Sequence, residues 1–170
     1  MDDAYFMRAA LEEARRALLA GEFPVGCVIV QAGRIIVRGA RRGSRPPHPS
    51  EIDHAEMVAL RQLDACHQGI PREDLVIYST MEPCLMCFAA ILLAGIERIV
   101  YAYEDVMGGG TQCDRSTMAP LYRDAAPVVI ADVCRSESLV LFQRFFSDPD
   151  NGYWADSLLS RYTLAQSSGI

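Results

Sequence analysis

The sequence predicts an α/β fold, in which helices cover both faces of a mixed, roughly five-stranded sheet as a three-layer α/β/α sandwich. An amphipathic helix followed by a β-hairpin pattern opens the chain, and strands then alternate with helices. The hairpin makes the first part of the sheet antiparallel, whereas the strand–helix–strand units make the later part parallel. Residues 1–170 form a single predicted domain, because no repeat or linker divides the chain.

The first half contains a helix, a hairpin and a loop. Apolar residues recur at helical spacing over residues 3–19. Two β-branched runs, 25–30 and 34–39, lie on either side of a short Gly-containing turn and therefore predict a hairpin. Residues 40–53 are rich in Arg, Pro, Gly and Ser, a composition that predicts a loop.

A second helix is expected after Asp53, which has Glu56 three residues later in the pattern of a capping box. The remaining elements follow in alternation. They are a strand at 75–80, a helix from Pro83 closed by Gly95, a strand at 96–101, a Gly-rich loop at 108–110, a strand at 128–133, a helix at 136–146 and a last helix within 153–164. Residues from about 147 to 170 form a C-terminal tail or lid in this prediction.

Composition and charge limit the classes of function. The chain is 51% hydrophobic, but its apolar runs are too short to cross a bilayer. It begins Met-Asp-Asp, without a basic segment before an apolar block, so we expect no signal peptide and a cytoplasmic location. The net charge of −6 gives no support for a nucleic-acid partner, although Arg38, Arg41, Arg42 and Arg45 could form a local basic patch.

Two short motifs combine residues that bind metals. His54-Ala55-Glu56 precedes Pro83-Cys84-Leu85-Met86-Cys87 by about thirty residues. Catalytic zinc sites use three Cys or His ligands and leave the fourth position for water. Cysteines three residues apart on the first helical turn point the same way, and the helix start favours their thiolates. His54, Cys84 and Cys87 are therefore the predicted zinc ligands.

Glu56 is the predicted catalytic residue, because it lies two residues from His54 and can face the same cavity. Its carboxylate could take a proton from the attacking water and pass it to a ring nitrogen and then to the leaving amine. The alternative is a purely structural zinc, which requires a fourth ligand. Cys66 and His67 lie roughly 18 Å from the start of their helix, whereas Cys113 stays open as a candidate.

With these motifs, the chain resembles the cytidine deaminase superfamily, in the branch of tRNA adenosine deaminases, guanine deaminases and fungal-type cytosine deaminases. The similarity runs from about residue 4 to 146 and includes the motifs at 22–26, 54–56 and 82–87. The resemblance implies a five-stranded mixed sheet, one Zn²⁺ per subunit and a homodimer. It also implies that the backbone of Ala55 and Glu82 lines the amine-bearing end of the substrate, and that Phe23 and Val25 are pocket walls.

Departures from this branch guide the expected substrate. Arg41 replaces an Asn that contacts the base in relatives. It either faces a carboxylate or an oxygen-rich ring of the substrate or points to solvent. Ala94-Gly95-Ile96 stands where the tRNA enzymes tend to have Ala-Arg-Ile. Trp154 could stack on a substrate ring or simply pack the last helix.

We therefore expect a hydrolytic deaminase of a small nucleobase or nucleoside. A tRNA-specific adenosine deaminase is the alternative, with tRNA as its partner. A non-catalytic, zinc-stabilised partner subunit is the second alternative, although the intact Glu56 argues against it.

Overall fold

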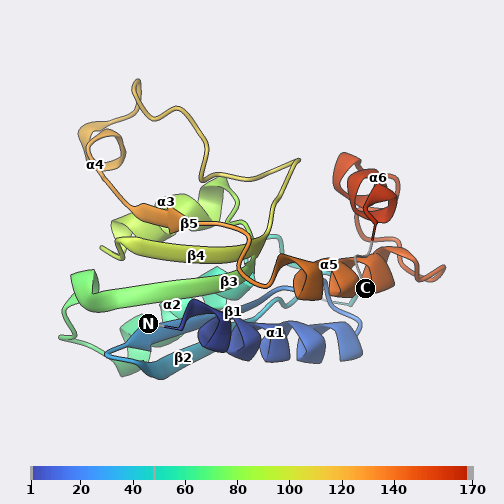
Figure 1. The fold of residues 1–170 in the computed structure, drawn as a ribbon, viewed down its shortest axis with the longest axis horizontal. Helices are drawn as coiled ribbons and strands as arrows, with labels where there is room; N and C mark the ends of the chain where they lie inside the picture. Colours follow the sequence, from blue (N-terminus) through green and yellow to red (C-terminus); the bar gives the residue numbers. More distant parts are fainter. Residues whose placement is uncertain (1, 48, 168–170) are drawn as a thin grey trace.

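A mixed five-stranded sheet forms the centre of the molecule in a computed structural model that describes residues 2–47 and 49–167 (Figure 1). His48, and residues 168–170 of the predicted tail, lie outside the described residues. The strand order is β2-β1-β3-β4-β5. The strands are β1 (Gly26–Gln31), β2 (Arg34–Ala40), β3 (Leu75–Met81), β4 (Arg98–Tyr103) and β5 (Val128–Ile130). The predicted α/β fold class is confirmed.

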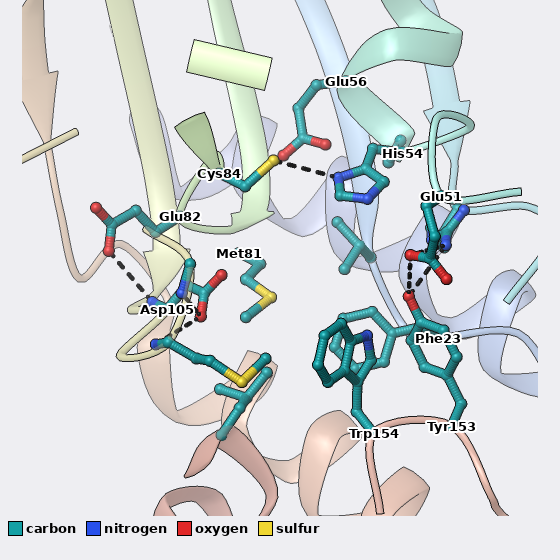
Figure 2. A pocket seen from close by; sticks show the side chains of 16 residues that line it. Phe23, Glu51, His54, Glu56, Met81, Glu82, Cys84, Asp105, Tyr153 and Trp154 are labelled. Carbon is teal, nitrogen blue, oxygen red and sulfur yellow. Dashed lines mark hydrogen bonds and ion pairs between the residues drawn. The ribbon is translucent and has the colours of Figure 1, made fainter. Parts of the chain in front are cut away.

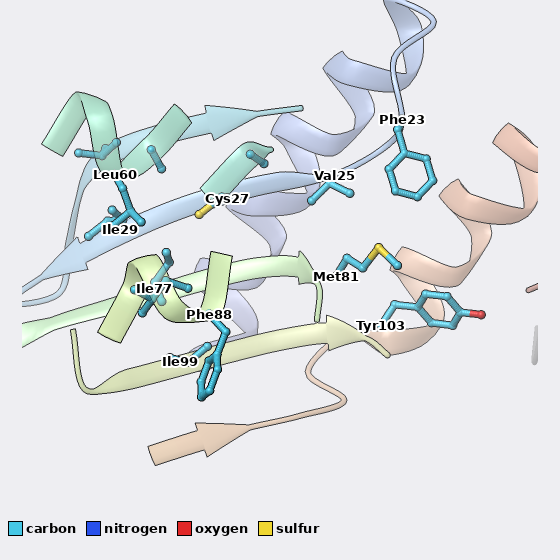
Figure 3. Packing of buried hydrophobic residues seen from close by; sticks show 14 of the residues in the cluster. Phe23, Val25, Cys27, Ile29, Leu60, Ile77, Met81, Phe88, Ile99 and Tyr103 are labelled. Atoms are coloured by element: carbon cyan, nitrogen blue, oxygen red, sulfur yellow. The ribbon is translucent and has the colours of Figure 1, made fainter. Parts of the chain in front are cut away.

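The sheet has an antiparallel and a parallel part, as the sequence predicts. β1 pairs antiparallel with both β2 and β3, whereas β3, β4 and β5 run parallel. Successive β1 side chains alternate between two cores, because strand side chains point to opposite faces. Cys27 and Ile29 belong to one core (Figure 3). Val28 and Val30 belong to the other.

Helices cover both faces of the sheet. α1 (Asp3–Leu19) and α5 (Arg135–Phe146) contact each other over one face, and α2 (Ala55–Cys66) and α3 (Leu85–Leu93) contact each other over the opposite face. α6 (Leu158–Ala165) packs against α5 at the end of the chain (Figure 1). Within the described residues, no helix is both long enough and apolar enough to span a membrane.

Two glycines let the helices approach the sheet closely. A Cβ added at Gly26 would lie 2.1 Å from the Ala10 carbonyl oxygen of α1, and one added at Gly39 would lie 2.4 Å from the Ala55 carbonyl oxygen of α2. Both clashes are with helix backbone, which cannot rotate away as a side chain can. The two contacts set the spacing of the outer layers from the sheet.

Replacing Gly26 with alanine is therefore expected to lower the free energy of unfolding by about 3 kcal/mol, the upper end of overpacking costs. Urea unfolding monitored by circular dichroism measures this change. Gly152→Ala is the matched control, because nothing lies within 4 Å of the added Cβ. Equal stability of the two variants would contradict the close-approach role of Gly26.

The start of α2 differs from the prediction. His54, not Asp53, is the residue preceding the helix, and it makes no side-chain cap. The Asp53 carboxylate forms an ion pair with Arg61 instead, and the Glu56 carboxylate accepts a hydrogen bond from Ser79. The predicted capping box is wrong because both of its carboxylates have other partners.

Other boundaries shift for local reasons. β4 begins at Arg98 rather than 96, because the Ile96 amide still closes α3 by donating to the Ile91 carbonyl. β5 ends at Ile130, where positive φ values at Asp132 and Cys134 turn the chain. The last helix begins only at Leu158, since Trp154 and Asp156 have φ values of 54° and 58°. α4 (Pro120–Arg123) and the 3₁₀ turn η1 (Arg72–Asp74) are not predicted.

An ion-pair cluster fixes the C-terminal helix to the sheet. Glu104, just after β4, accepts hydrogen bonds from Arg135 of α5 and from the Tyr162 hydroxyl of α6, the latter at 2.6 Å. Burial alone would raise the pKa of Glu104, but the hydrogen bonds from Arg135 and Tyr162 outweigh it and lower the pKa. The folded state therefore favours the ionised carboxylate.

Glu104→Gln is expected to lower the free energy of unfolding by about 1 kcal/mol at pH 7, after allowance for solvent screening. Because the folded pKa lies below the unfolded value of 4.5, the contribution is complete above that pH. It disappears as pH falls through the folded pKa. Chemical unfolding between pH 7 and 3 should therefore show wild type and variant converging, whereas a constant difference would contradict this account.

Candidate metal centre and active site

The predicted metal ligands meet between two helix starts. His54 immediately precedes α2, and Cys84 immediately precedes α3, which follows β3; Cys87 lies in the first turn of α3. The His54 Nδ1 atom is 3.5 Å from the Cys84 Sγ and 3.5 Å from the Cys87 Sγ. All three ligand atoms lie within 4.8 Å of one another. One cation can therefore contact all of them.

The spacing of these atoms fits zinc. Zn–S bonds near 2.3 Å and Zn–N bonds near 2.0 Å, at tetrahedral angles, place sulfur and nitrogen about 3.5 Å apart. Both observed nitrogen–sulfur distances are 3.5 Å. The soft thiol and imidazole donors also match zinc in type.

The two thiols interact strongly with each other. A hydrogen bond from Cys87, followed by one from His54, lowers the pKa of Cys84 to about 4 despite its burial. The Cys84 sulfur in turn raises the pKa of Cys87, and burial raises it further. Two adjacent sulfurs cannot both carry negative charge without a cation, so this donor set is suited to a divalent metal.

No fourth protein ligand joins the group within residues 2–47 and 49–167. Cys66 and His67 are at the far end of α2, and the Cys113 sulfur instead faces the Gly109 carbonyl oxygen at 3.9 Å. A three-ligand set is typical of catalytic rather than structural zinc.

Glu56 lies beside the ligand group and is 3% exposed. Its Oε1 accepts a hydrogen bond from the Ser79 hydroxyl at 2.7 Å, while its Oε2 lies 3.6 Å from the Cys87 sulfur. Burial raises the pKa of the Glu56 carboxyl above its ordinary value. A carboxylate that is fixed on one oxygen and close to a metal site on the other is suited to moving protons.

A cavity of about 250 Å³ opens onto this group. Figure 2 shows Glu56, His54 and Cys84 on one side and Phe23, Tyr153 and Trp154 on the other, with Met81 between them. Each residue predicted to contact substrate lines this cavity, namely Phe23, Val25, Arg41, Ala55, Glu82 and Trp154. Their contact with substrate stays a prediction.

Other residues that line the cavity are not predicted from the sequence, among them Glu51, Met81, Asp105, Met107 and Leu159. Met81 ends β3, and Asp105 follows β4 by two residues. Ligands bind at the carboxyl ends of parallel strands, so residues at these strand ends could have been proposed from the predicted elements. No sequence pattern places Glu51 or Leu159 at the cavity, because Glu51 lies in a long loop and Leu159 lies in the C-terminal tail.

The Glu82 side chain organises the loop that borders the cavity. Its carboxylate accepts hydrogen bonds from the Asp105 amide at 3.2 Å, from the Thr111 amide at 3.2 Å and from the Thr111 hydroxyl. A Cβ at Gly109 would lie 2.5 Å from this carboxylate, so the loop requires glycine there. Glu82 thereby fixes the position of residues 105–111.

Arg41 is buried rather than pointing to solvent, and is 3% exposed. Its Nη1 donates to the carbonyl oxygens of Arg42 and Ser50, and its Nη2 donates to Glu51 and to the Tyr153 hydroxyl. The alternative that Arg41 is an ordinary surface residue is therefore wrong. The oxygen atoms that Arg41 contacts belong to the chain itself, and a contact between Arg41 and a carboxylate or oxygen-rich ring of the substrate stays a prediction.

Solved structures share this fold. A structure from a study of A-to-I editing by tRNA:A34 deaminases superposes with a TM-score of 0.68 and 35% identity, covering 81% of this chain and 98% of the other. A guanine deaminase from Nitrosomonas europaea superposes with a TM-score of 0.66 at 22% identity, over 82% of this chain and 81% of the other, a likeness that shows the fold alone.

The sequence matches agree with the site. The family described as the cytidine and deoxycytidylate deaminase zinc-binding region matches residues 1–103, which include all three candidate ligands and Glu56. The chain belongs to this family of zinc-dependent hydrolytic deaminases.

Curated relatives within the family are named tRNA-specific adenosine deaminases. The Agrobacterium fabrum protein is 36% identical over 85% of this chain and 93% of its own length. A Streptococcus pyogenes protein is 42% identical over 64% of this chain and 67% of its own length, and the match spans 63% of the same protein from other strains.

Proposed function

We propose that this protein hydrolytically deaminates an adenine ring carried by RNA, with tRNA as the substrate class. The reaction rests on the meeting of His54, Cys84, Cys87 and Glu56 at one end of the cavity. The substrate class rests on the relatives named tRNA-specific adenosine deaminases, one of which aligns over 85% of the chain.

His54, Cys84 and Cys87 would hold one zinc ion, whose chemistry is to lower the pKa of a water molecule so that it becomes a nucleophile near neutral pH. The backbone assists one of the ligands, because a backbone hydrogen bond from Cys87 at the start of α3 helps to lower the pKa of Cys84. The half-buried His54 ring touches both sulfurs through one nitrogen, which fixes its orientation.

Glu56 moves the protons in this proposal. The Ser79 hydrogen bond holds one carboxylate oxygen and leaves the other towards the ligand group. Glu56 takes a proton from the attacking water and gives it to the ring nitrogen beside the reacting carbon. It then transfers the second proton to the amine, the C–N bond breaks, ammonia leaves and a C=O group replaces the amino group.

The apolar walls exclude water from the ring and hold it in place. Phe23 and Val25 are almost fully buried in one wall, whereas Trp154 is 45% exposed in another. An aromatic side chain at that position can stack on a base, which contributes about 1–3 kcal/mol in nucleic-acid complexes. The backbone of Ala55 and Glu82 would face the amino group that leaves.

A small free base or nucleoside is the second candidate substrate. It is favoured by the C-terminal segment, which places Tyr153 and Trp154 against the cavity. The net charge of −6 also favours a small substrate over a polyanion. The two candidates share the chemistry and differ in what the ring is attached to.

Ammonia release by the zinc-loaded protein separates these candidates. The substrates are an anticodon stem-loop RNA, adenosine, adenine, guanine and cytosine at equal concentration. Release from RNA with salt-sensitive KM supports the tRNA proposal. Release from a free base or nucleoside, with none from RNA, would overturn the tRNA substrate and retain the deaminase.

We also propose that the protein is a homodimer, as the resemblance implies. An apolar hollow between α3 and α4 is lined by residues that include Phe88, Leu92, Met118 and Tyr122, and Leu93 nearby in sequence is 66% exposed. Analytical ultracentrifugation should give twice the chain mass of 18.8 kDa. A single-chain mass at micromolar concentration would contradict the dimer.

A further inference from the structure

Arg41 has little capacity left to bind substrate. A guanidinium group has five N–H donors. Its two terminal nitrogens each donate to two acceptors of the chain, at 2.7 Å for the Ser50 carbonyl, 3.1 Å for the Tyr153 hydroxyl and 3.4 Å for Glu51. These acceptors belong to two segments far apart in sequence, the loop after β2 and the C-terminal segment after α5.

The Tyr153 hydroxyl completes a ring of polar contacts. It accepts from Arg41 and donates to the Glu51 carboxylate at 2.9 Å. Burial raises the pKa of Tyr153, so its hydroxyl keeps the proton that it donates. A buried guanidinium is costly unless it is paired, and these contacts supply the partners of Arg41. Figure 2 shows Glu51 and Tyr153, which provide two of them.

The Tyr153 ring connects these contacts to the cavity. It packs on Phe23 at 5.5 Å between ring centroids and edge-on against Trp154 at 5.9 Å. The Arg41 guanidinium lies 5.8 Å from the centre of the Tyr153 ring. The Asn151 side chain forms two hydrogen bonds with the backbone of Tyr153. It accepts one from the Tyr153 amide at 2.9 Å and donates one to the Tyr153 carbonyl oxygen at 3.2 Å.

Trp154, which contacts the Tyr153 ring, has an unusual backbone conformation. Its φ of 54° is in the left-handed region, which a non-glycine residue adopts only where its surroundings hold it there. It lines the cavity opposite Glu56 and Cys84 (Figure 2).

We propose that Arg41 is a positioning residue, which acts through Tyr153 to hold Trp154 as the wall against which the substrate ring lies. This inference rests on the proposed deaminase function for its effect on substrate. Arg41 and Tyr153 thus set how tightly the ring binds, whereas the proton transfers belong to Glu56.

Tyr153→Phe tests the proposal, because it removes the shared hydroxyl and keeps the ring. Trp154 is the only tryptophan in the chain, so its fluorescence reports the wall directly. We expect greater acrylamide quenching of Trp154, a KM about tenfold higher and a nearly unchanged kcat, since hydrogen bonds to charged groups are among the strongest. Tyr162→Phe is the matched control: it removes a similar hydroxyl–carboxylate bond, at 2.6 Å from Glu104, away from the cavity.

Arg41→Lys provides the second variant, because a lysine ammonium cannot bridge the same acceptors in the plane of a guanidinium. Its effects on quenching and KM should match those of Tyr153→Phe, and the double variant should be little worse than either alone. Wild-type quenching in both single variants, or an equal change in Tyr162→Phe, would overturn the proposal. The fluorescence comparison holds even if no tested substrate is deaminated, so failure of the proposed function is recognised separately.

Discussion

Glu56→Gln is expected to lower kcat by about 10⁴-fold while zinc stays bound, since general acid–base groups contribute up to about that factor. The amide keeps the size of the side chain and can still contact Ser79, but it cannot accept and return a proton. Steady-state ammonia release measures kcat, and atomic absorption measures the zinc content. Both measurements are needed, because loss of zinc would abolish turnover for a different reason.

Glu13→Gln is the matched control for this change. Glu13 is also a buried carboxylate, at 6% exposure, but it pairs with Arg16 and Arg38 on α1 and β2, away from the cavity. We expect wild-type kcat from this control. Substantial turnover by Glu56→Gln with zinc present would contradict the proposed role of Glu56 in proton transfer.

Cys87→Ala is expected to reduce bound zinc from about one per chain to nearly none, because two remaining ligands make a weak site. Stability should fall as well, since zinc that binds only the folded state stabilises it by mass action. Zinc content after dialysis and thermal unfolding with and without added zinc measure the two effects. The variant should lose the zinc-dependent rise in melting temperature.

Cys113→Ala serves as the control, because its half-buried sulfur faces only the Gly109 carbonyl among the described contacts. It should retain zinc and its stabilising effect. If Cys113→Ala lost zinc as completely as Cys87→Ala, Cys113 would be a fourth ligand and the centre would be structural rather than catalytic.

The sequence predicted which residues meet at the candidate metal centre, but it missed several residues of the cavity walls. The ligand spacing around His54, Cys84 and Cys87 is local to two helix starts, so short motifs were sufficient to identify it. The strand order is likewise consistent with the hairpin and the strand–helix alternation. Short sequence patterns therefore predict those features whose geometry depends on the local backbone.

The wall residues depend on contacts between distant segments. Arg41 could have pointed to solvent. Its burial depends on acceptors in the loop after β2 and on the Tyr153 hydroxyl, 112 positions later, and neither can be read from the local pattern. The predicted Asp53 capping box is wrong because Arg61, eight residues after Asp53, and Ser79, on β3, bind the two carboxylates that the pattern pairs with backbone N–H groups. The patterns that predict helices, strands and caps do not show which side chains of other segments become hydrogen-bond partners.

The proposed hydrolysis of an adenine ring in tRNA has a direct signature, because the oxygen atom in the product comes from water. The zinc-loaded protein is incubated with an adenosine-containing anticodon stem-loop in heavy-oxygen water, and the digested nucleosides are analysed by mass spectrometry. We expect inosine that carries one oxygen from the solvent, formed by wild type and not by Glu56→Gln. Absence of any inosine, with ammonia released only from a free base or nucleoside, would contradict the tRNA assignment. Absence of ammonia from every substrate would contradict the deaminase itself.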